Sequence, residues 1–158
     1  MSRQLDIKEA KQRAGRFCAF RERSPNELFE KIQSWGISEE NASKLVAELS
    51  KEGYVDEQRF ANAFCNDKFE FNSWGKQKIK ALIYSHKLSE SAIQNALDRI
   101  DPEKYEIRIK ELAMSKWSRL EREEEFKRKQ KTAAYLSGKG FELDLIWSAI
   151  NSFEEEGH

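Results

Sequence analysis

Few residues in this sequence could support catalysis or hold a metal. The chain has two histidines, His86 and His158, and two cysteines, Cys18 and Cys65. Catalysis needs a base, a nucleophile or a metal held beside its partners, and the sequence contains no phosphate-binding glycine loop, no HExxH and no GxSxG motif. We therefore expect a protein that is not an enzyme and that has no cofactor and no metal site.

The cysteines and the hydropathy of the chain indicate where the protein resides. Cys18 and Cys65 lie in helix-like segments without CxxC spacing, so we expect two small buried side chains in a reducing compartment. No apolar run approaches the roughly 18 residues that cross a bilayer, and the N-terminus lacks the apolar core of a signal peptide. These features predict a soluble, cytoplasmic protein without a membrane partner.

Basic residues are more informative, because they form three clusters in a chain without net charge. Lys and Arg total 28, as do Asp and Glu. Residues 1–23 hold seven basic and three acidic side chains, a net charge of +4. A second cluster, Lys76, Lys80 and Lys87, falls within about 40° on a helical wheel, and a third is the basic run 127–131.

Such clusters can contact phosphates or acidic protein surfaces. The alternative is that they are solvated faces that keep a helical protein soluble. Trp74 stands apart from the other three tryptophans, which fall in the apolar pattern, because it opens a helix where an exposed ring could reach a partner. Six residues are the expected charge contacts, none of them catalytic: Arg13, Arg16, Lys76, Lys80, Lys127 and Lys129.

Helices must position these residues, because 35% of the chain is charged and only 2 prolines and 7 glycines occur. Six small or apolar positions recur after 51 residues, and five of them recur again after a further 53. The first set is Leu28, Ile32, Ile37, Ala42, Val46 and Leu49; the second is Ile79, Ile83, Leu88, Ile93, Leu97 and Ile100; the third is Leu136, Phe141, Ile146, Ile150 and Phe153.

Helix boundaries follow from capping residues. Ser24-Pro25-Asn26-Glu27 is a strong start signal, and Ser38, Ser89, Asp56 and Asp101 precede other helices. The first helix of each repeat is expected near 6–20, 57–71 and 103–121, with Phe71 among the inward residues. The sequence thus predicts an all-α fold of three tandem three-helix repeats, 1–52, 53–101 and 102–158, in an elongated, curved array.

The middle repeat resembles that of a known family. The segments that carry the resemblance are Gly53-Tyr54-Val55-Asp56-Glu57-Gln58-Arg59-Phe60-Ala61, Trp74-Gly75-Lys76-Gln77-Lys78-Ile79 and Leu88 to Leu97. They are similar to the central repeat of the RecX family, bacterial regulators of the RecA recombinase, and the outer repeats fit the same family. Lys87-Leu88 departs from the family's usual glycine and isoleucine, so we expect that turn to be built differently.

The resemblance implies a non-catalytic modulator that lies in the groove of the RecA filament on single-stranded DNA. It implies restraint of filament growth, ATP turnover and strand exchange in recombination, DNA repair and the SOS response. The implied partners are RecA and its filament, with room for weak direct contact with DNA, and we expect a monomer.

Two other interpretations stay open. Three-helix units resemble helix-turn-helix modules, so the chain could be an autonomous DNA-binding protein, although the outward residues of its third helices are acidic or neutral: Glu39, Glu40, Glu48, Glu90 and Asp98. A helical scaffold for some other protein is the remaining alternative.

Overall fold

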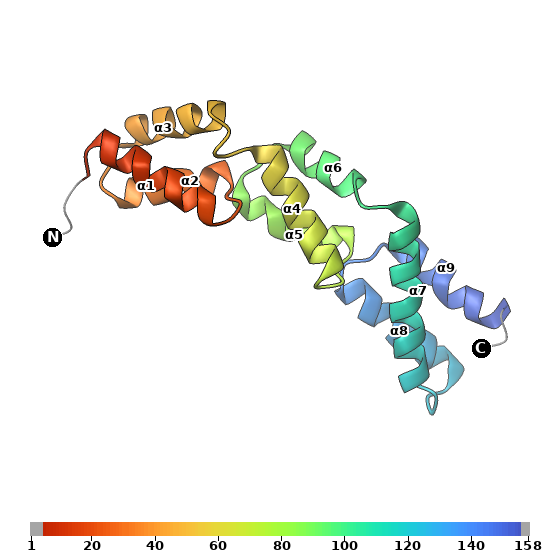
Figure 1. Cartoon of the computed structure of the whole chain (residues 1–158). Coiled ribbons are helices and arrows are strands. Elements are labelled where there is room, and N and C mark those ends of the chain that lie inside the picture. The colour runs from red at the N-terminus through yellow and green to blue at the C-terminus, as the bar shows by residue number, and fades with distance from the viewer. Residues whose placement is uncertain (1–4, 156–158) are drawn as a thin grey trace. The chain divides into compact units, whose positions relative to one another are not determined.

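The computed structural model describes residues 5–155, and that stretch is built of helices without any strand (Figure 1). His158 lies outside the described residues. Within residues 5–155, nine α-helices and one short 3-10 helix follow one another: α1 Ile7–Phe20, α2 Pro25–Ser34, α3 Glu39–Lys51, α4 Glu57–Glu70, α5 Lys76–Ile83, η1 Tyr84–His86, α6 Glu90–Asp98, α7 Pro102–Arg119, α8 Glu125–Gly138 and α9 Leu143–Glu155. The all-α prediction is confirmed.

The helices begin at the polar residues that the sequence predicts. Ser24 Oγ accepts the Glu27 N–H at 3.0 Å and the Glu27 carboxylate accepts the Ser24 N–H at 3.1 Å, which completes a capping box. Asp56 accepts the Arg59 N–H at 2.8 Å and Asp101 accepts the Glu103 N–H at 2.9 Å. These local bonds satisfy amide groups that a helix start would otherwise leave without partners.

The turns that lead into α3, α6 and α9 each contain one left-handed residue. Gly36 has φ 88° and Gly140 has φ 96°, as expected for glycines that end helices. Lys87, at the corresponding position of the middle repeat, has φ 55° and ψ 40° and follows the 3-10 helix η1. The middle turn therefore also has a left-handed residue at this position, although that conformation is unfavourable for any residue with a Cβ atom.

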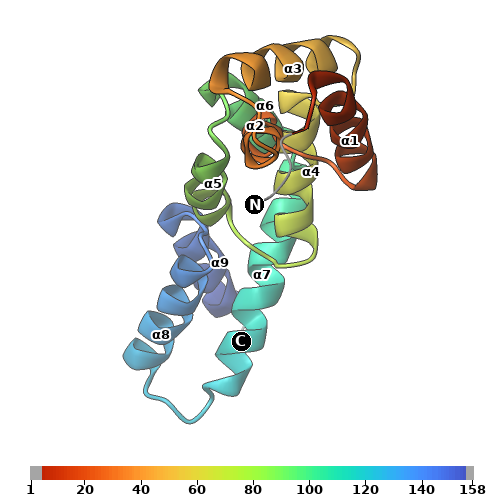
Figure 2. The ribbon, with the colours of Figure 1, turned by 90° about the vertical axis from the view of Figure 1, so that its left-hand side faces the viewer.

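The chain divides into two compact units. Unit 1 comprises residues 1–64 and 83–96, and unit 2 comprises 65–82 and 97–158. In unit 1, α2 packs on α1, α3 and η1 around a core that includes Leu28, Ile32 and Leu49. In unit 2, α7, α8 and α9 pack on one another, as Figure 2 shows, around Ile109, Leu136 and Ile146.

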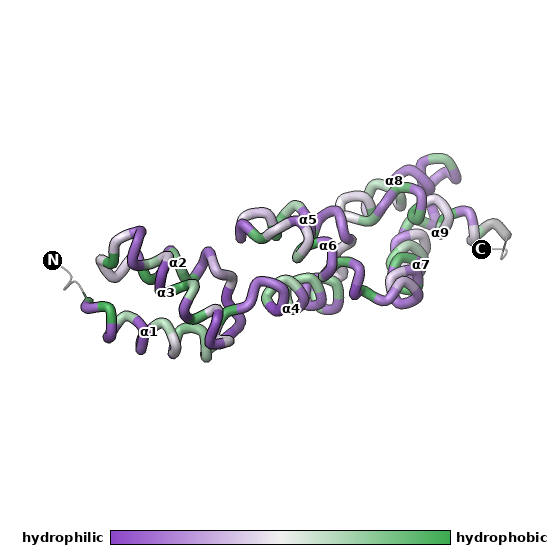
Figure 3. The backbone as a smooth tube through the Cα atoms, turned by 90° about the horizontal axis from the view of Figure 1, so that it is seen from above, coloured by the Kyte–Doolittle hydropathy of each residue, from purple (hydrophilic) through white to green (hydrophobic). Residues whose placement is uncertain are grey.

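Burial follows the amphipathic pattern of the helices, visible in Figure 3 as hydrophobic and hydrophilic residues that interchange along each helix. Both cysteines are free and buried, as expected, and burial raises the pKa of Cys65 to about 11. The prediction that Phe71 faces the core is wrong: α4 ends at Glu70, and the Phe71 side chain is 83% exposed while Phe69 is buried. No helix within 5–155 is both long and apolar enough to cross a membrane.

Candidate partner-binding surface

The six expected charge contacts differ in how far the fold already engages them. Arg16, Lys80 and Lys127 are exposed, and within the described residues neither Arg16 nor Lys80 forms an ion pair. The other three have internal partners: the Arg13 guanidinium lies 5.6 Å from the centre of the Trp35 ring, Lys76 Nζ lies 5.1 Å from that of Tyr105, and Lys129 Nζ lies 3.6 Å from Glu125 Oε1.

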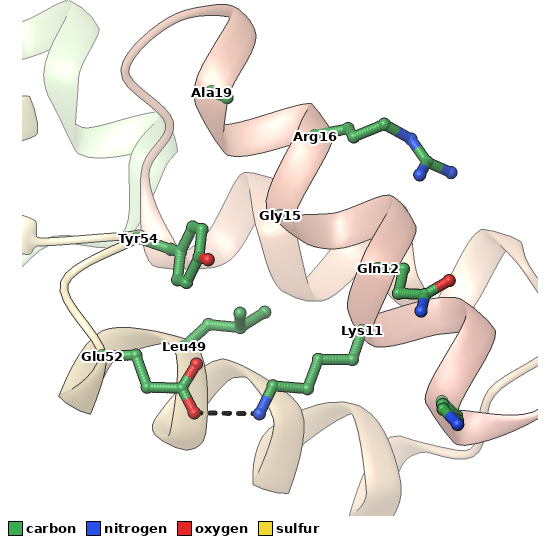
Figure 4. Close-up of a pocket in the computed structure, with 9 residues that line it drawn as sticks. Lys11, Gln12, Gly15, Arg16, Ala19, Leu49, Glu52 and Tyr54 are labelled. Carbon is green, nitrogen blue, oxygen red and sulfur yellow. Dashed lines mark hydrogen bonds and ion pairs between the residues drawn. The ribbon is translucent and has the colours of Figure 1, made fainter.

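The first basic cluster borders an open groove of about 490 Å³ between α1 and the end of α3. Leu49 and Tyr54 line it, and Figure 4 shows Lys11 reaching toward Glu52 while Arg16 extends away from the groove. Lys11 Nζ lies 2.9 Å from carboxylate oxygens of both Glu48 and Glu52, and these hydrogen bonds raise the Lys11 pKa. The charge of Lys11 is therefore compensated locally, whereas Lys8 and Arg16 are exposed cations at the same groove.

The second cluster is smaller than the sequence indicates. Helix α5 ends at Ile83, so Lys87 belongs to the turn and not to the helical face that carries Lys76 and Lys80. The wheel-based row of three lysines is therefore wrong for Lys87. Lys76 is half-buried, and its N–H donates to the Tyr105 hydroxyl at 2.9 Å, so of the two lysines that remain in this cluster Lys80 is the more exposed.

Most basic side chains of the third cluster form contacts within unit 2. Arg128 Nε donates to the Trp117 carbonyl at 2.9 Å, and its guanidinium lies 3.9 Å from the centre of the Trp117 ring. Lys131 pairs with Glu123, and this hydrogen bond lowers the Glu123 pKa. Lys127 stays exposed at the surface of α8.

The residues that carry the family resemblance hold unit 1 together. Arg59 Nε contacts both Glu22 carboxylate oxygens, at 2.9 and 2.5 Å, and its Nη2 donates to the Gly53 and Tyr54 carbonyls at 3.2 and 3.3 Å. One guanidinium thus joins the start of α4 to the preceding turn and to the segment after α1. Sequence reasoning did not foresee this role, because none of these partners is adjacent to Arg59 along a helix.

The neighbouring motif residues act in the same way. Gln58 donates to the Ala92 carbonyl at 3.0 Å, and the Glu57 carboxylate accepts the Ser89 N–H. Both bonds join α4 to α6 within unit 1. Glu57, Gln58 and Arg59 of the first motif segment thus join parts of unit 1 to one another.

Gly75, in the second motif, has an equivalent role in unit 2. Its N–H donates to the Lys139 carbonyl at 2.8 Å, and the Gln77 N–H donates to the Gly140 carbonyl at 3.0 Å. A Cβ atom on Gly75 would collide with the backbone of Gly140 and Phe141, and one on Gly140 would collide with Lys78. Glycine is needed at both positions because two stretches of backbone meet there.

The fold and this surface define the class of protein. Three-helix elements carry exposed cations, and the described part of the chain has no group of three or more His, Cys, Asp or Glu side chains that could hold a metal. Several polar motif residues form hydrogen bonds within the fold. These features define an all-helical protein of three-helix elements with cations exposed on its surface.

Comparison with known proteins places the chain within this class. Residues 56–97 match the second three-helix domain of RecX, and residues 105–150 match the third. The chain belongs to the RecX family. The resemblance found in the middle repeat is thereby confirmed.

Curated relatives agree along most of the chain. The Regulatory protein RecX of Oceanobacillus iheyensis is 25% identical over 138 residues, which cover 87% of this chain and 51% of the relative. That of Acinetobacter baylyi is 28% identical over 138 residues, which cover 86% of this chain and 82% of the relative. The chain therefore spans about half the length of the first relative, and the shared name is that of a regulatory protein, in agreement with the expectation of a non-enzymatic function.

Solved structures confirm the fold. RecX from Lactobacillus salivarius superposes with a TM-score of 0.88 at 18% identity, covering 94% of this chain and 96% of the other. A second crystal structure of regulatory protein RecX gives a TM-score of 0.82 at 21% identity, covering 92% and 71%. The helical arrangement is thus shared at low sequence identity.

Proposed function

We propose that this chain binds RecA and the RecA filament on single-stranded DNA, and restrains filament extension, ATP hydrolysis and strand exchange. The observation that carries the proposal is the match to two consecutive RecX domains, in a chain whose three basic clusters each keep an exposed cation. The proposed partner places the action in the bacterial cytoplasm, with the chain acting as a monomer.

Charge contacts of this kind give a useful affinity only when several of them form together. An exposed ion pair contributes about 0 to 1 kcal/mol, so Arg16, Lys80 or Lys127 alone cannot hold a filament. Contacts made together by the three proposed repeats, 1–52, 53–101 and 102–158, would give avidity without a deep pocket. Where a cation meets a DNA phosphate, the contact also weakens with salt because counterions are released on binding.

The outward faces of the third helices favour this proposal over autonomous reading of duplex DNA. Glu39, Glu40, Glu48 and Glu90 are exposed. A helix that enters a DNA groove would bring such carboxylates close to phosphates, with repulsion as the result. RecA with its filament is thus the partner that the family and the charge distribution together support.

The test measures RecA ATP hydrolysis and strand exchange on circular single-stranded DNA with increasing amounts of the protein. We expect both activities to fall as the protein approaches stoichiometry with filament subunits. Unchanged rates at equimolar protein would refute the proposal. Sequence-selective duplex binding without RecA would favour the helix-turn-helix alternative instead.

The surface is tested by reversing the exposed cations together. Arg16→Glu, Lys80→Glu and Lys127→Glu should retain the helical circular dichroism signal and weaken inhibition about tenfold or more. Lys76 is left unchanged in this variant because its half-buried side chain and its backbone N–H contact Tyr105. Lys104→Glu, at an exposed lysine outside the three clusters, is the matched control and should inhibit like the wild type.

A further inference from the structure

The loop between α4 and α5, residues 71–75, whose course Figure 2 shows, exposes an aromatic ring from a backbone held by hydrogen bonds. Phe71 is 83% exposed. The Ser73 N–H donates to the Phe69 carbonyl and the Trp74 N–H donates to the Lys68 carbonyl, both at 3.1 Å. Ser73 has φ 54°, a conformation that costs a non-glycine residue free energy and persists only where surrounding contacts impose it.

Arg108 of α7 imposes that conformation. Its Nη1 donates to the Phe69 carbonyl at 2.8 Å and to Ser73 Oγ at 3.1 Å, and its guanidinium lies 4.7 Å from the centre of the Phe69 ring. Its Nη2 lies 3.4 Å from Glu70 Oε2. The carboxylate of the residue next to Phe71 therefore forms an ion pair with Arg108. Since the loop is held from a neighbouring helix, the exposure of Phe71 is a built feature of the fold.

Positive charge is fixed beside the same loop. Lys78 Nζ lies 4.4 Å and Lys68 Nζ lies 5.1 Å from the centre of the Trp74 ring. Cation–π attraction holds two ammonium groups at one indole. With Glu70 paired to Arg108, Asp67 is the carboxylate of this segment that remains to oppose them.

We propose that this loop binds single-stranded nucleic acid, with one base stacked on Phe71 and neighbouring phosphates on Lys68 and Lys78. The loop thus combines an exposed ring at Phe71 with two ammonium groups at Trp74, and this combination suits an unpaired strand because each nucleotide offers a base face for stacking and a phosphate for pairing. A duplex buries its base faces and cannot use the ring. The inference goes beyond the proposed function, since the strand binds here without RecA.

The test uses fluorescein-labelled dT15 and fluorescence anisotropy in low salt without RecA, with Phe71→Ala as the main variant. Loss of one stacked base should weaken binding about tenfold, within a range of roughly 5- to 100-fold. Phe71→Trp should restore it, and Lys78→Gln should weaken it and reduce its salt dependence. Phe20→Ala is the matched control, because Phe20 is also 83% exposed, and it should bind like the wild type.

A second readout locates the contact. An oligonucleotide that contains 5-iodouracil should crosslink to Phe71 under ultraviolet light, and the crosslink should disappear in Phe71→Ala. Equal affinity of Phe71→Ala and the wild type, equal loss in Phe20→Ala, or no binding of dT15 at 100-fold excess of protein would each overturn the site. So would unchanged dT15 binding by a Phe71→Ala variant that no longer inhibits RecA, because the ring would then serve a protein contact.

The two proposals fail separately. Binding of dT15 without any effect on RecA activity would keep this site and remove the proposed function. Inhibition of RecA by a protein that does not bind dT15 would do the reverse.

Discussion

Within each unit, one set of contacts between helices stands out, and the two sets differ in chemistry. In unit 1, polar side chains join the elements: Arg59 pairs with Glu22, and the His86 ring lies 3.7 Å from Glu27 and packs on Phe60 and Phe64. In unit 2, the backbone at Gly75 meets the backbone at Gly140, and the buried Tyr105 hydroxyl links Lys76 to Glu142. The stability of unit 1 should therefore depend on charged side chains and fall at acid pH. The stability of unit 2 should depend on side-chain volume and fall at alkaline pH.

The largest effect is expected at Gly75. Gly75→Ala places a methyl group against the Gly140 backbone, so two backbone hydrogen bonds must lengthen or break, and unit 2 should lose about 3 kcal/mol or more of its free energy of unfolding. Hydrogen exchange should show faster exchange in α5, α8 and α9. The control is Gly138→Ala, a helical glycine with open space around it, which should stabilise the protein by about 0.5 to 1 kcal/mol; equal effects would disprove the close approach.

Tyr105→Phe should have the next largest effect. It removes a buried hydroxyl that accepts from the Lys76 N–H and donates to Glu142, at a cost of about 2 kcal/mol. Burial and the Glu142 carboxylate raise the Tyr105 pKa well above its usual value, so its contribution is complete below about pH 10 and is lost at higher pH. Denaturant titrations from pH 8 to 11 should show a steeper alkaline loss for the wild type than for Tyr105→Phe.

Glu27 provides the matching acid test in unit 1. Burial acts to raise its pKa, but the Ser24 N–H and the Arg21 guanidinium outweigh burial and lower it. Its contribution is therefore present above about pH 4.3 and is lost as the pH falls through the lower folded-state pKa. Glu27→Gln should lower the free energy of unfolding by about 1 kcal/mol at pH 7 and reduce the further loss of stability as the pH falls. An unchanged loss of stability at acid pH would contradict this assignment.

The smallest expected effect is at Lys87, in the turn of unit 1 that departs from the family pattern. Lys87→Gly removes the penalty of a left-handed non-glycine residue and adds the entropy cost of glycine, for a net stabilisation of about 0.5 kcal/mol. Urea unfolding of the two proteins at pH 7 measures the difference. Destabilisation by the glycine would mean that the lysine side chain itself stabilises the turn.

Local features could be predicted from the sequence and non-local ones could not. The caps at Ser24, Asp56 and Asp101 were predictable because donor and acceptor lie within three residues. The exposure of Phe71 was not, because the end of α4 is fixed by Arg108, which is 35 residues from Ser73 along the chain. A helical wheel assumes that the helix continues through Phe71, whereas in the folded chain α4 ends at Glu70.

The candidate surface shows the same limit. Sequence clustering located the basic residues, but it could not separate Lys80, which is exposed, from Lys76, which packs on Tyr105. Arg128 is likewise a packing residue because of the Trp117 ring, which belongs to another helix. Charge density along a chain predicts where cations are, and tertiary contacts decide which of them a partner can reach.

Direct binding to the preformed RecA filament is the measurement that tests the central claim most directly. Filaments assembled on single-stranded DNA with a non-hydrolysable ATP analogue are sedimented with the wild type, the triple charge reversal at Arg16, Lys80 and Lys127, and the Lys104→Glu control. We predict that the wild type and the control sediment with the filament and that the triple variant stays in solution. Wild-type protein that remains in the supernatant at stoichiometric filament would contradict the proposal that this member of the RecX family acts on RecA.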